Sequence, residues 1–457
     1  MIYGIKTALA RMLKNPEAEK ILAEELPFYE RIISEKGNLS RSVEQLSETY
    51  GFSSIVSGIG EKLSGLNTPE NMVNEEERRL MEAFRKIDEG DKASAAVSEL
   101  HHQNSIEPGK TWLDTDGKPI QAHGGAVFYW NGWYYWYGEN KEHTDTKNGV
   151  WTWGMRMYRS KDLCNWESLG IVVPPVIDNP NSFFFPTMKL DRPHLLRCPA
   201  TGMFVMWMKV CGPEASFAVL QSEKIDGPYT VVREFYCPFG HRVGDFDLVM
   251  DDKSGKAYVY FDADHNSVMC MELSSDYLEA VREVNSSYRN LKSPFTREGI
   301  ALFEKDGRKF MFTSSMSGYI PNKSDSASAS SWEDEFVSLG NPHIDDETNA
   351  SFNSQITKVF RIEGTDRFVA MADRWISYIH IDARLSDIVF RVSAADHKSA
   401  DVKVTDQERK EALSIDNMER VNTSIATYVW LPVQWKDGKP VIRWYDEWKP
   451  QISVVNK

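Results

Sequence analysis

Seven carboxylates lie at the start or the end of a predicted β-strand, where a side chain can face a pocket. They are Glu139, Asp191, Asp245, Asp247, Asp264, Glu298 and Asp373. Hydrolysis of a glycosidic bond requires a protonated carboxyl that donates a proton and a second group that activates water. Because most Asp and Glu side chains are surface charges, the neighbouring residues decide which of the seven are candidates.

Glu298 and Asp191 have the neighbours expected at the mouth of a buried strand. Glu298 precedes the apolar run 299–303, and Asp191 precedes Arg192-Pro193 and a second apolar run. Burial against apolar residues raises the pKa of a carboxyl and keeps it protonated near neutral pH. Gln355 stands in a similar place, after Ser354.

Two further stretches combine polar groups with aromatic rings, as carbohydrate sites do. Asp373-Arg374-Trp375 ends a predicted strand with an acid, a base and a ring. The stretch 116–125 ends with His123 and two glycines, and it runs on into an aromatic strand that ends at Glu139. A His that stands alone beside glycines is more often a hydrogen-bonding or core group than a metal ligand.

From residue 106 onward the sequence predicts short strands, and these strands position the candidate residues. Turn residues recur roughly every 8–12 positions, the spacing expected of all-β folds. Three units consist of a turn followed by an aromatic-rich strand, at 201–208, 253–261 and 306–313. This repeat predicts a mainly-β, five-bladed propeller over 106–457, closed by the strand-like tail at 430–448.

Residues 1–105 have helical periodicity and predict a small all-α N-terminal domain. The helix expected after Asn74 begins with an N-cap and three acids, and carries Leu80, Met81, Phe84 and Ile87 on one face. Nothing in this region indicates catalysis. We expect a packing module, or one through which the protein forms a homo-oligomer.

The composition excludes several classes of partner. The 457 residues carry a formal net charge of −14, which argues against binding to nucleic acid. No apolar run approaches the roughly 18 residues of a membrane span. The five scattered cysteines show no paired metal spacing, and the N-terminal residues lack a signal-peptide pattern. We therefore expect a cytoplasmic protein.

The chain from about 110 to 435 resembles glycoside hydrolase family 43, and most of all its exo-β-1,3-galactanase branch. The resemblance rests on the segment 114–125, on Tyr135 to Lys141, on Arg192-Pro193 and Phe204 to Trp207, on Gly227-Pro228-Tyr229, and on Asp373-Arg374-Trp375. Segment 317–322 resembles a Ser-Gly-Trp-x-Pro-Asn motif of the family, with Tyr319 in place of the Trp. The resemblance implies a five-bladed propeller and an inverting mechanism.

The resemblance also implies roles for individual residues. Glu298 matches the general acid, although Gly299-Ile300 follows it where that branch has Ala-Pro. Asp245 matches the aspartate that orients the acid and sets its pKa, with Gly244 where relatives carry Arg. Gln355 matches a glutamine that replaces the usual base, and Asp191 matches a Glu before Arg-Pro. An amide is a poor base, so we interpret Gln355 as a group that positions water, with help from Asp191.

The remaining matched positions imply contacts with the sugar. They are Glu139, His123, Arg192, Tyr319, Asp373, Arg374 and Trp375. We expect no catalytic metal or cofactor; a structural Ca²⁺ on the propeller axis is the one addition that the family resemblance allows.

The sequence thus predicts an inverting exo-glycoside hydrolase that releases galactose from β-1,3-linked galacto-oligosaccharides. Two alternatives remain open: an α-L-arabinofuranosidase or β-xylosidase on the same propeller, and a carbohydrate-binding propeller without turnover.

Overall fold

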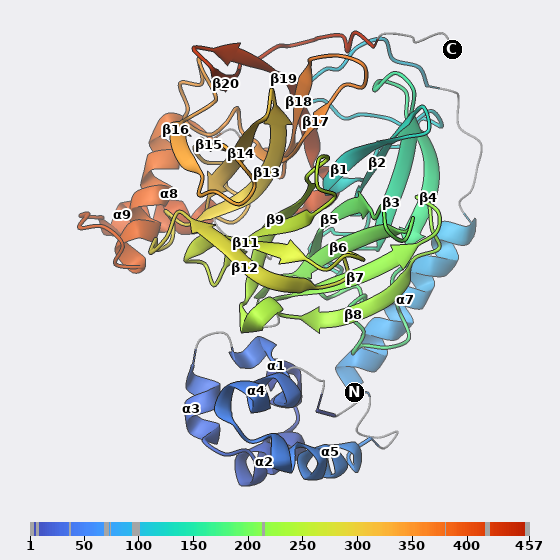
Figure 1. The fold of residues 1–457 in the computed structure, drawn as a ribbon, viewed down its shortest axis with the longest axis vertical. Coiled ribbons are helices and arrows are strands. Elements are labelled where there is room, and N and C mark those ends of the chain that lie inside the picture. Colours follow the sequence, from blue (N-terminus) through green and yellow to red (C-terminus); the bar gives the residue numbers. More distant parts are fainter. Residues whose placement is uncertain are drawn as a thin grey trace.

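Five antiparallel sheets of four strands each dominate the described part of the chain (Figure 1). The computed structural model describes residues 4–5, 9–35, 38–67, 73, 75–93, 101–212, 215–379, 381–415 and 421–452. Each sheet consists of four strands that are consecutive in the sequence, so each is one propeller blade. The predicted mainly-β, five-bladed propeller with helices before it is confirmed.

Within each blade the first strand is innermost in the ring. Blade I contains β1 (His123–Trp130), β2 (Trp133–Glu139), β3 (Met155–Ser160) and β4 (Glu167–Val173). Blade II contains β5 (Leu190–Arg197), β6 (Phe204–Val210), β7 (Ser216–Ser222) and β8 (Thr230–Tyr236). Blade III contains β9 (Val243–Met250), β10 (Ala257–Ala263), β11 (Ser267–Leu273) and β12 (Ala280–Ser287). Blade IV contains β13 (Arg297–Lys305), β14 (Arg308–Ser315), β15 (Asp325–Ala329) and β16 (Val337–Gly340). Blade V contains β17 (Gln355–Arg361), β18 (Phe368–Arg374), β19 (Thr427–Lys436) and β20 (Lys439–Ile442).

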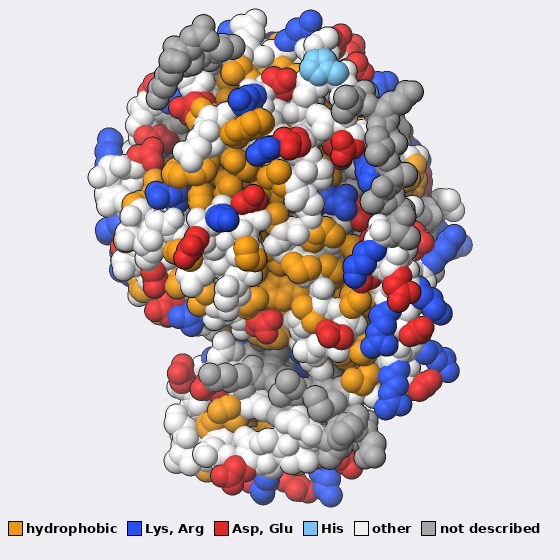
Figure 2. Space-filling view, turned by 90° about the vertical axis from the view of Figure 1, so that its right-hand side faces the viewer, with side chains coloured by type: hydrophobic (Ala, Val, Ile, Leu, Met, Phe, Trp, Pro, Cys, Tyr) orange, Lys and Arg blue, Asp and Glu red, His pale blue; other side chains and the backbone are white. Residues whose placement is uncertain are grey.

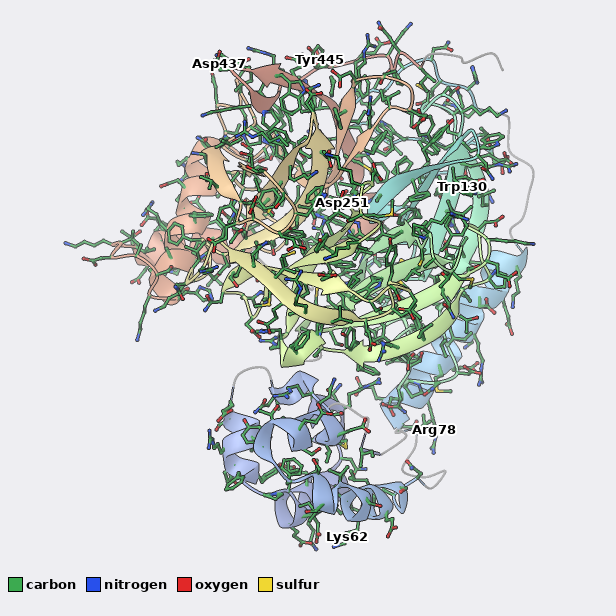
Figure 3. The ribbon with its side chains drawn as sticks, in the orientation of Figure 1. Lys62, Arg78, Trp130, Asp251, Asp437 and Tyr445 are labelled. Carbon is green, nitrogen blue, oxygen red and sulfur yellow. The ribbon has the colours of Figure 1, made fainter. Side chains whose placement is uncertain are left out.

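The inner strands close a ring in the order β1, β5, β9, β13, β17 and back to β1, because each packs against the next. The three turn-and-strand units in the sequence correspond to β6, β10 and β14, the second strands of three successive blades. The repeat seen in the sequence is therefore the hairpin between the first and second strands. Trp130 and Asp251, labelled in Figure 3, mark that hairpin in blades I and III.

A bulge lies near the start of every inner strand. In β13 the step of three residues from Glu298 to Ala301 faces a step of two, from Ser314 to Phe312. The same one-residue excess occurs in β1, β5, β9 and β17. A bulge bends its strand and re-aims the adjacent side chains. Its recurrence in all five blades gives their first residues a common position at one end of the ring.

The ring closes between blades V and I on a cluster of large aromatic side chains. Trp136 of β2 packs against Trp112, Trp166, Tyr428 and Trp430, with ring centroids 4.6 to 6.0 Å apart. The backbone adds a hydrogen bond of 2.6 Å from Gly109 N to Tyr428 O. The predicted closing strands in the tail are β19 and β20, and they complete blade V.

The N-terminal helices divide into two parts. Helices α1 (Leu9–Met12), α2 (Pro16–Glu25), α3 (Tyr29–Ser34), α4 (Val43–Tyr50) and α5 (Val56–Ser64) share their own apolar core and form the smaller lobe in Figure 2. Helix α7 (Glu75–Ala93) instead packs on the propeller: Phe84 contacts Trp153 and Phe185 edge-on, with centroids 5.9 and 5.3 Å away. The predicted cap Asn74 lies outside the described residues. The boundary at residue 105 stays a prediction.

Two helices interrupt blade V, although we expected only strands after residue 106; that expectation was wrong for 383–415. They are α8 (Ala383–Asp396) and α9 (Asp406–Ile415), inserted between β18 and β19. Ile388, Val389 and Val392 follow helical spacing and bury against Trp375 and its neighbours. Among the described helices, none combines the length and apolarity of a transmembrane segment.

Candidate active site

A pocket of about 280 Å³ lies at the end of the ring where the inner strands begin. All five blades contribute to it, because its lining includes Glu139, Asp191, Asp245, Glu298 and Gln355. Each of these lies at or next to a bulge, so the repeated backbone irregularity gathers residues that are far apart in the sequence.

Asp245 is an ionised carboxylate in the wall of the pocket. Its Oδ2 lies 2.8 Å from Arg192 Nη2, and its Oδ1 lies 2.9 Å from Lys209 Nζ. Burial alone would raise the pKa of Asp245, but these two cations lower it well below its usual range. The carboxylate also accepts a hydrogen bond of 2.9 Å from Gly299 N, the residue after Glu298. Asp245 therefore fixes the backbone that carries Glu298.

The pKa of Glu298 is shifted in the opposite direction from that of Asp245. Burial raises its pKa well above the ordinary value, and the neighbouring Asp245 carboxylate raises it further, against the lowering effect of Arg192 and Lys209. The bulge beside it requires glycine: Gly299 has φ of 59°, and a Cβ there would lie 2.8 Å from Ser314 Oγ. Two carboxyls with divergent pKa values are the signature of an acid and its electrostatic partner.

Gln355 is fixed by four side chains. Its Nε2 donates to Glu298 Oε1 at 3.2 Å and to Ser314 Oγ at 2.9 Å. Its Oε1 accepts from Arg192 Nη2 and, at 3.3 Å, from Trp375 Nε1. An amide has two donor protons and two acceptor lone pairs. All four are used, so in this conformation Gln355 has no free site for the water that the sequence hypothesis assigned to it.

Lys141 links the remaining two carboxylates of the pocket. Its Nζ lies 2.8 Å from Glu139 Oε2 and 3.6 Å from Asp191 Oδ1. Burial raises the pKa of Glu139 to about 8 although Lys141 opposes this. For Asp191 burial also acts upward, but Lys141 and Lys209 outweigh it and lower the pKa. Asp191 is thus ionised near neutral pH, whereas Glu139 retains its proton to a higher pH.

Aromatic rings form one wall of the pocket. Trp151 and Tyr319 are stacked with centroids 6.0 Å apart and planes inclined by 25°, and Trp375 lies 5.3 Å from Tyr319. Trp151 Nε1 donates to Asp191 Oδ1 at 2.7 Å. Rings opposite carboxylates and cations suit a sugar, which has apolar faces and a rim of hydroxyls.

Comparison with known proteins agrees with this arrangement. A family model described as "Glycosyl hydrolases family 43" matches residues 117–378, more than half of the chain. The chain belongs to glycosyl hydrolase family 43. The predicted family is thereby confirmed, and with it the assignment to a family of glycosidases.

Solved structures of family 43 enzymes resemble the chain. The β-1,3-galactosidase BT0265 is 28% identical with a TM-score of 0.60, over 76% of this chain and 64% of that protein. The β-1,3-galactosidase BT3683 is 26% identical with a TM-score of 0.59, over 75% of this chain and 100% of that protein. An exo-β-1,3-galactanase from Phanerochaete chrysosporium is 21% identical with a TM-score of 0.61, over 77% and 69% of the two chains, and supports the fold alone. No curated protein sequence matches.

Three residues with implied sugar contacts do not line the pocket of this family 43 protein. His123 is fully buried, stacks on Tyr428 with centroids 4.6 Å apart, and lies 2.8 Å from Asp373 Oδ1 through its Nδ1. Asp373 is buried behind Gln355 and accepts a bond of 2.8 Å from Gly124 N through Oδ2. Successive residues of a strand face opposite sides. Arg374 therefore points away and donates to the carbonyls of Phe352 and Asn353.

The other predicted sugar ligands do line it: Glu139, Arg192, Tyr319 and Trp375. Two of the seven initial carboxylates have structural roles instead. Asp247 is fully buried and binds Lys358, His194 and the backbone N of Leu302. Asp264 pairs with His241 outside the pocket.

Sequence reasoning missed several lining residues: Trp151, Lys189, Lys209, Cys211, Asp262 and His265. Aligning the blades would have found Lys209, since it pairs with Asp191 as Glu139 pairs with His123. It would not have found Asp262, because blade III has Ala263 at the position of Glu139 and Lys209. Asp262 instead faces the bulge, where its Cβ lies 2.7 Å from the position of a Cβ at Gly244. Trp151 and Lys189 stand in loops outside the repeat.

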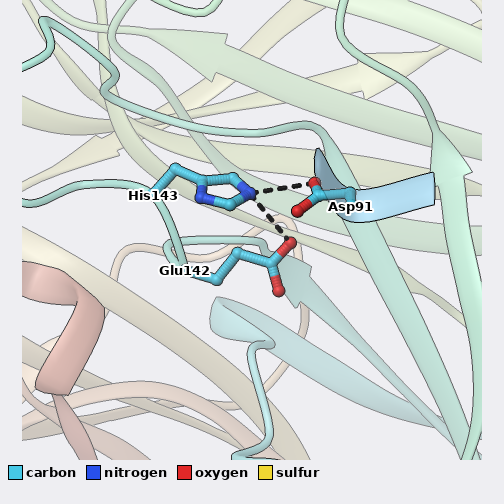
Figure 4. Close-up of side chains that lie close together, drawn as sticks. All are labelled: Asp91, Glu142 and His143. Atoms are coloured by element: carbon cyan, nitrogen blue, oxygen red, sulfur yellow. Dashed lines mark hydrogen bonds and ion pairs between the residues drawn. The ribbon is translucent and has the colours of Figure 1, made fainter. Parts of the chain in front are cut away.

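One cluster among the described residues has the donor atoms for a metal ion: Asp91, Glu142 and His143 (Figure 4). It lies outside the pocket, between α7 and the loop after β2. His143 Nε2 is 2.9 Å from Asp91 Oδ2 and 3.3 Å from Glu142 Oε1. Arg156 Nη2 lies 3.1 Å from the same Glu142 oxygen, so a cation already neutralises it. These contacts fit an ion-pair network better than a metal site. A structural Ca²⁺ stays a prediction.

Proposed function

We propose that this protein is an inverting exo-glycosidase that releases galactose from β-1,3-linked galacto-oligosaccharides. The observation that carries the proposal is the pairing of Glu298, with its raised pKa, and the ionised Asp245 in a pocket built by all five blades. The similarity to two β-1,3-galactosidases at 28% and 26% identity supports the choice of sugar.

In this proposal Glu298 protonates the glycosidic oxygen as the bond breaks. Burial, together with the nearby Asp245, raises the pKa of Glu298 and keeps it protonated, and Arg192 and Lys209 compensate the charge of Asp245. The transition state has oxocarbenium character, which neighbouring carboxylates stabilise.

Water activation falls to Asp191 in this scheme. An inverting enzyme holds its two groups roughly 6.5–9.5 Å apart so that water fits between them. Gln355 is too close to Glu298 for this, at 3.2 Å, and it has no free hydrogen-bonding site. Asp191 lines the same pocket, and its lowered pKa keeps it ionised, so its carboxylate is available to accept a proton from water. Gln355 then orients the acid.

The size of the pocket supports exo action on short substrates. Its volume of about 280 Å³ is at the lower end of the range for ligand sites, roughly 300–1,000 Å³, and suits one terminal sugar at the acid. None of the five cysteines forms a disulfide in the described structure, which agrees with the cytoplasmic location that we propose for hydrolysis of short oligosaccharides.

The test is hydrolysis of β-1,3-galactobiose beside aryl β-galactoside, α-L-arabinofuranoside and β-xyloside, with the anomer of the first product followed by NMR. We expect α-galactose as the initial product, because inversion converts a β-linkage into an α-hemiacetal. Initial β-galactose would refute inversion. Turnover of the pentosides alone would transfer the assignment to the alternative sugars, and binding without turnover would leave a carbohydrate-binding propeller.

A further inference from the structure

A second cavity of about 370 Å³ lies beside the active-site pocket. The two share three lining residues, Trp151, Lys189 and Tyr319. The stacked pair of Trp151 and Tyr319 thus borders both cavities, and Trp151 also donates a hydrogen bond to Asp191. A substituent on a sugar in the active-site pocket is therefore within reach of the second cavity.

The second cavity has a cationic and hydroxyl-rich lining. Four threonines contribute to it, and no acidic residue does among the described residues. The hydroxyls of Thr144 and Thr423 bond each other at 2.7 Å. Thr146 and Thr187 lie on the same lining, and their hydroxyls form no hydrogen bond with another described residue.

Lys189 is the one cation among the described residues that line this cavity, and its surroundings differ from those of the neighbouring Lys141. Both ammonium groups lie over the Trp151 ring, at 5.1 and 4.9 Å from its centroid. Lys141 lies 2.8 Å from Glu139 and 3.6 Å from the ionised Asp191, whereas Lys189 has no ion-pair partner among the described residues. In a chain with a net charge of −14, an uncompensated cation inside a cavity points to an anionic ligand.

We propose that this cavity is a subsite for an anionic substituent on the sugar in the active-site pocket, with Lys189 as its charged ligand. The occupant is a carboxylate, as on a uronic acid, or a sulfate ester. The inference rests on the proposed function, and it narrows the substrate to acidic galacto-oligosaccharides. The free threonine hydroxyls are placed to bind the hydroxyls of the substituent.

The test compares kcat/KM for three derivatives of β-1,3-galactobiose that carry β-glucuronosyl, β-glucosyl or sulfate at O6 of the terminal galactose. The first two differ only in carboxylate against hydroxymethyl. We expect the glucuronosyl substrate to exceed the glucosyl one about tenfold in the unmodified protein, as one charged hydrogen bond gives. In Lys189→Met the ratio should fall to about one. Lys147→Met, which changes an exposed lysine that lines neither cavity, should keep the tenfold ratio.

A ratio of about one in the unmodified protein, with no gain from sulfate either, would overturn the proposal. Preference for the sulfated substrate alone would assign the subsite to sulfate. If no galactoside is hydrolysed, the proposed function fails and a separate measurement decides: titration of tryptophan fluorescence with sodium glucuronate, sodium sulfate and glucose. A signal from either anion that Lys189→Met abolishes would support the subsite without turnover, and its absence would refute it.

Discussion

Gln355 Nε2 lies 3.2 Å from Glu298 Oε1 and donates to it. In a protonated carboxyl the carbonyl oxygen is the stronger acceptor, so this contact favours Oε2 as the oxygen that carries the acidic proton. Because Gln355 is itself held by Arg192, Ser314 and Trp375, it fixes the direction in which Glu298 presents its proton. The relationship defines Gln355 as a positioning residue for the acid.

Glu298→Gln should reduce kcat on β-1,3-galactobiose by roughly 10²–10⁴-fold, the usual contribution of a general acid. The amide retains the shape of the side chain, so KM should change little. Steady-state kinetics on the disaccharide give both values.

The leaving group supplies the control for that variant. The 2,4-dinitrophenolate group leaves without needing a proton. Hydrolysis of 2,4-dinitrophenyl β-galactoside should therefore be far less sensitive to Glu298→Gln. Equal losses on the two substrates would show that Glu298 does not act as the acid.

Gln355→Glu should shift the alkaline limb of the kcat/KM profile to higher pH. A new carboxylate at this position would lie within hydrogen-bonding distance of Glu298, and a like charge disfavours ionisation. Gln355→Ala should lower kcat through loss of orientation, with no such upward shift. If Gln355→Ala left turnover unchanged, the positioning role would be wrong.

Asp245→Asn should move the alkaline limb in the opposite direction. Glu298 acts in its protonated form, so activity falls as the pH rises through its pKa. The Asp245 carboxylate raises this pKa, whereas Arg192 and Lys209 lower it. The substitution removes the negative charge and leaves both cations, so the pKa of Glu298 should fall and the limb should appear at lower pH. A limb that stays in place would show that another group sets it.

Much of this site could be anticipated because the propeller repeats. Turn-forming residues, and the alternation of inward and outward side chains along the strands, indicate the blades. Glu298, Gln355 and Asp191 lie at the starts of predicted strands. The direction of a side chain depends on single-residue alternation and on bulges, which a lone sequence does not reveal. That is why Arg374, next to Asp373, was expected in the pocket and points away from it.

The helices of blade V were missed for a related reason. Their apolar residues, such as Ile388 and Val389, lie in a short insertion surrounded by strand patterns, and the regular turn spacing outweighed the local period. Trp151 was missed because it reaches the pocket from the loop between β2 and β3, outside any repeat. Loops often carry functional residues, but they lack the sequence periodicity from which strands can be predicted.

Phe84→Ala should destabilise the propeller by about 3–5 kcal/mol, the usual cost of deleting a buried phenyl ring. Phe84 has no exposed surface and contacts Trp153 and Phe185, so its helix α7 is part of the propeller core. Thermal unfolding followed by tryptophan fluorescence measures the effect. Arg79→Ala, on the exposed face of the same helix, should leave the transition where it is. An unchanged transition in Phe84→Ala would mean that α7 unfolds with the N-terminal bundle.

His143→Gln should lower the melting temperature at pH 5.5 and have little effect at pH 9. Burial alone would lower the pKa of His143, but hydrogen bonds to Glu142 and Asp91 outweigh it and raise the pKa. A raised pKa in the folded state stabilises that state below the unfolded value of about 6.5, and the gain is lost as the pH rises through the folded pKa. Melting curves at the two pH values, with the exposed His102→Gln as control, test this. Because Asp91 belongs to α7 and His143 to the loop that leads to Trp151, a decrease confined to low pH would identify a protonated bridge between that helix and the active-site wall. Equal decreases at both pH values would assign His143 a packing role only.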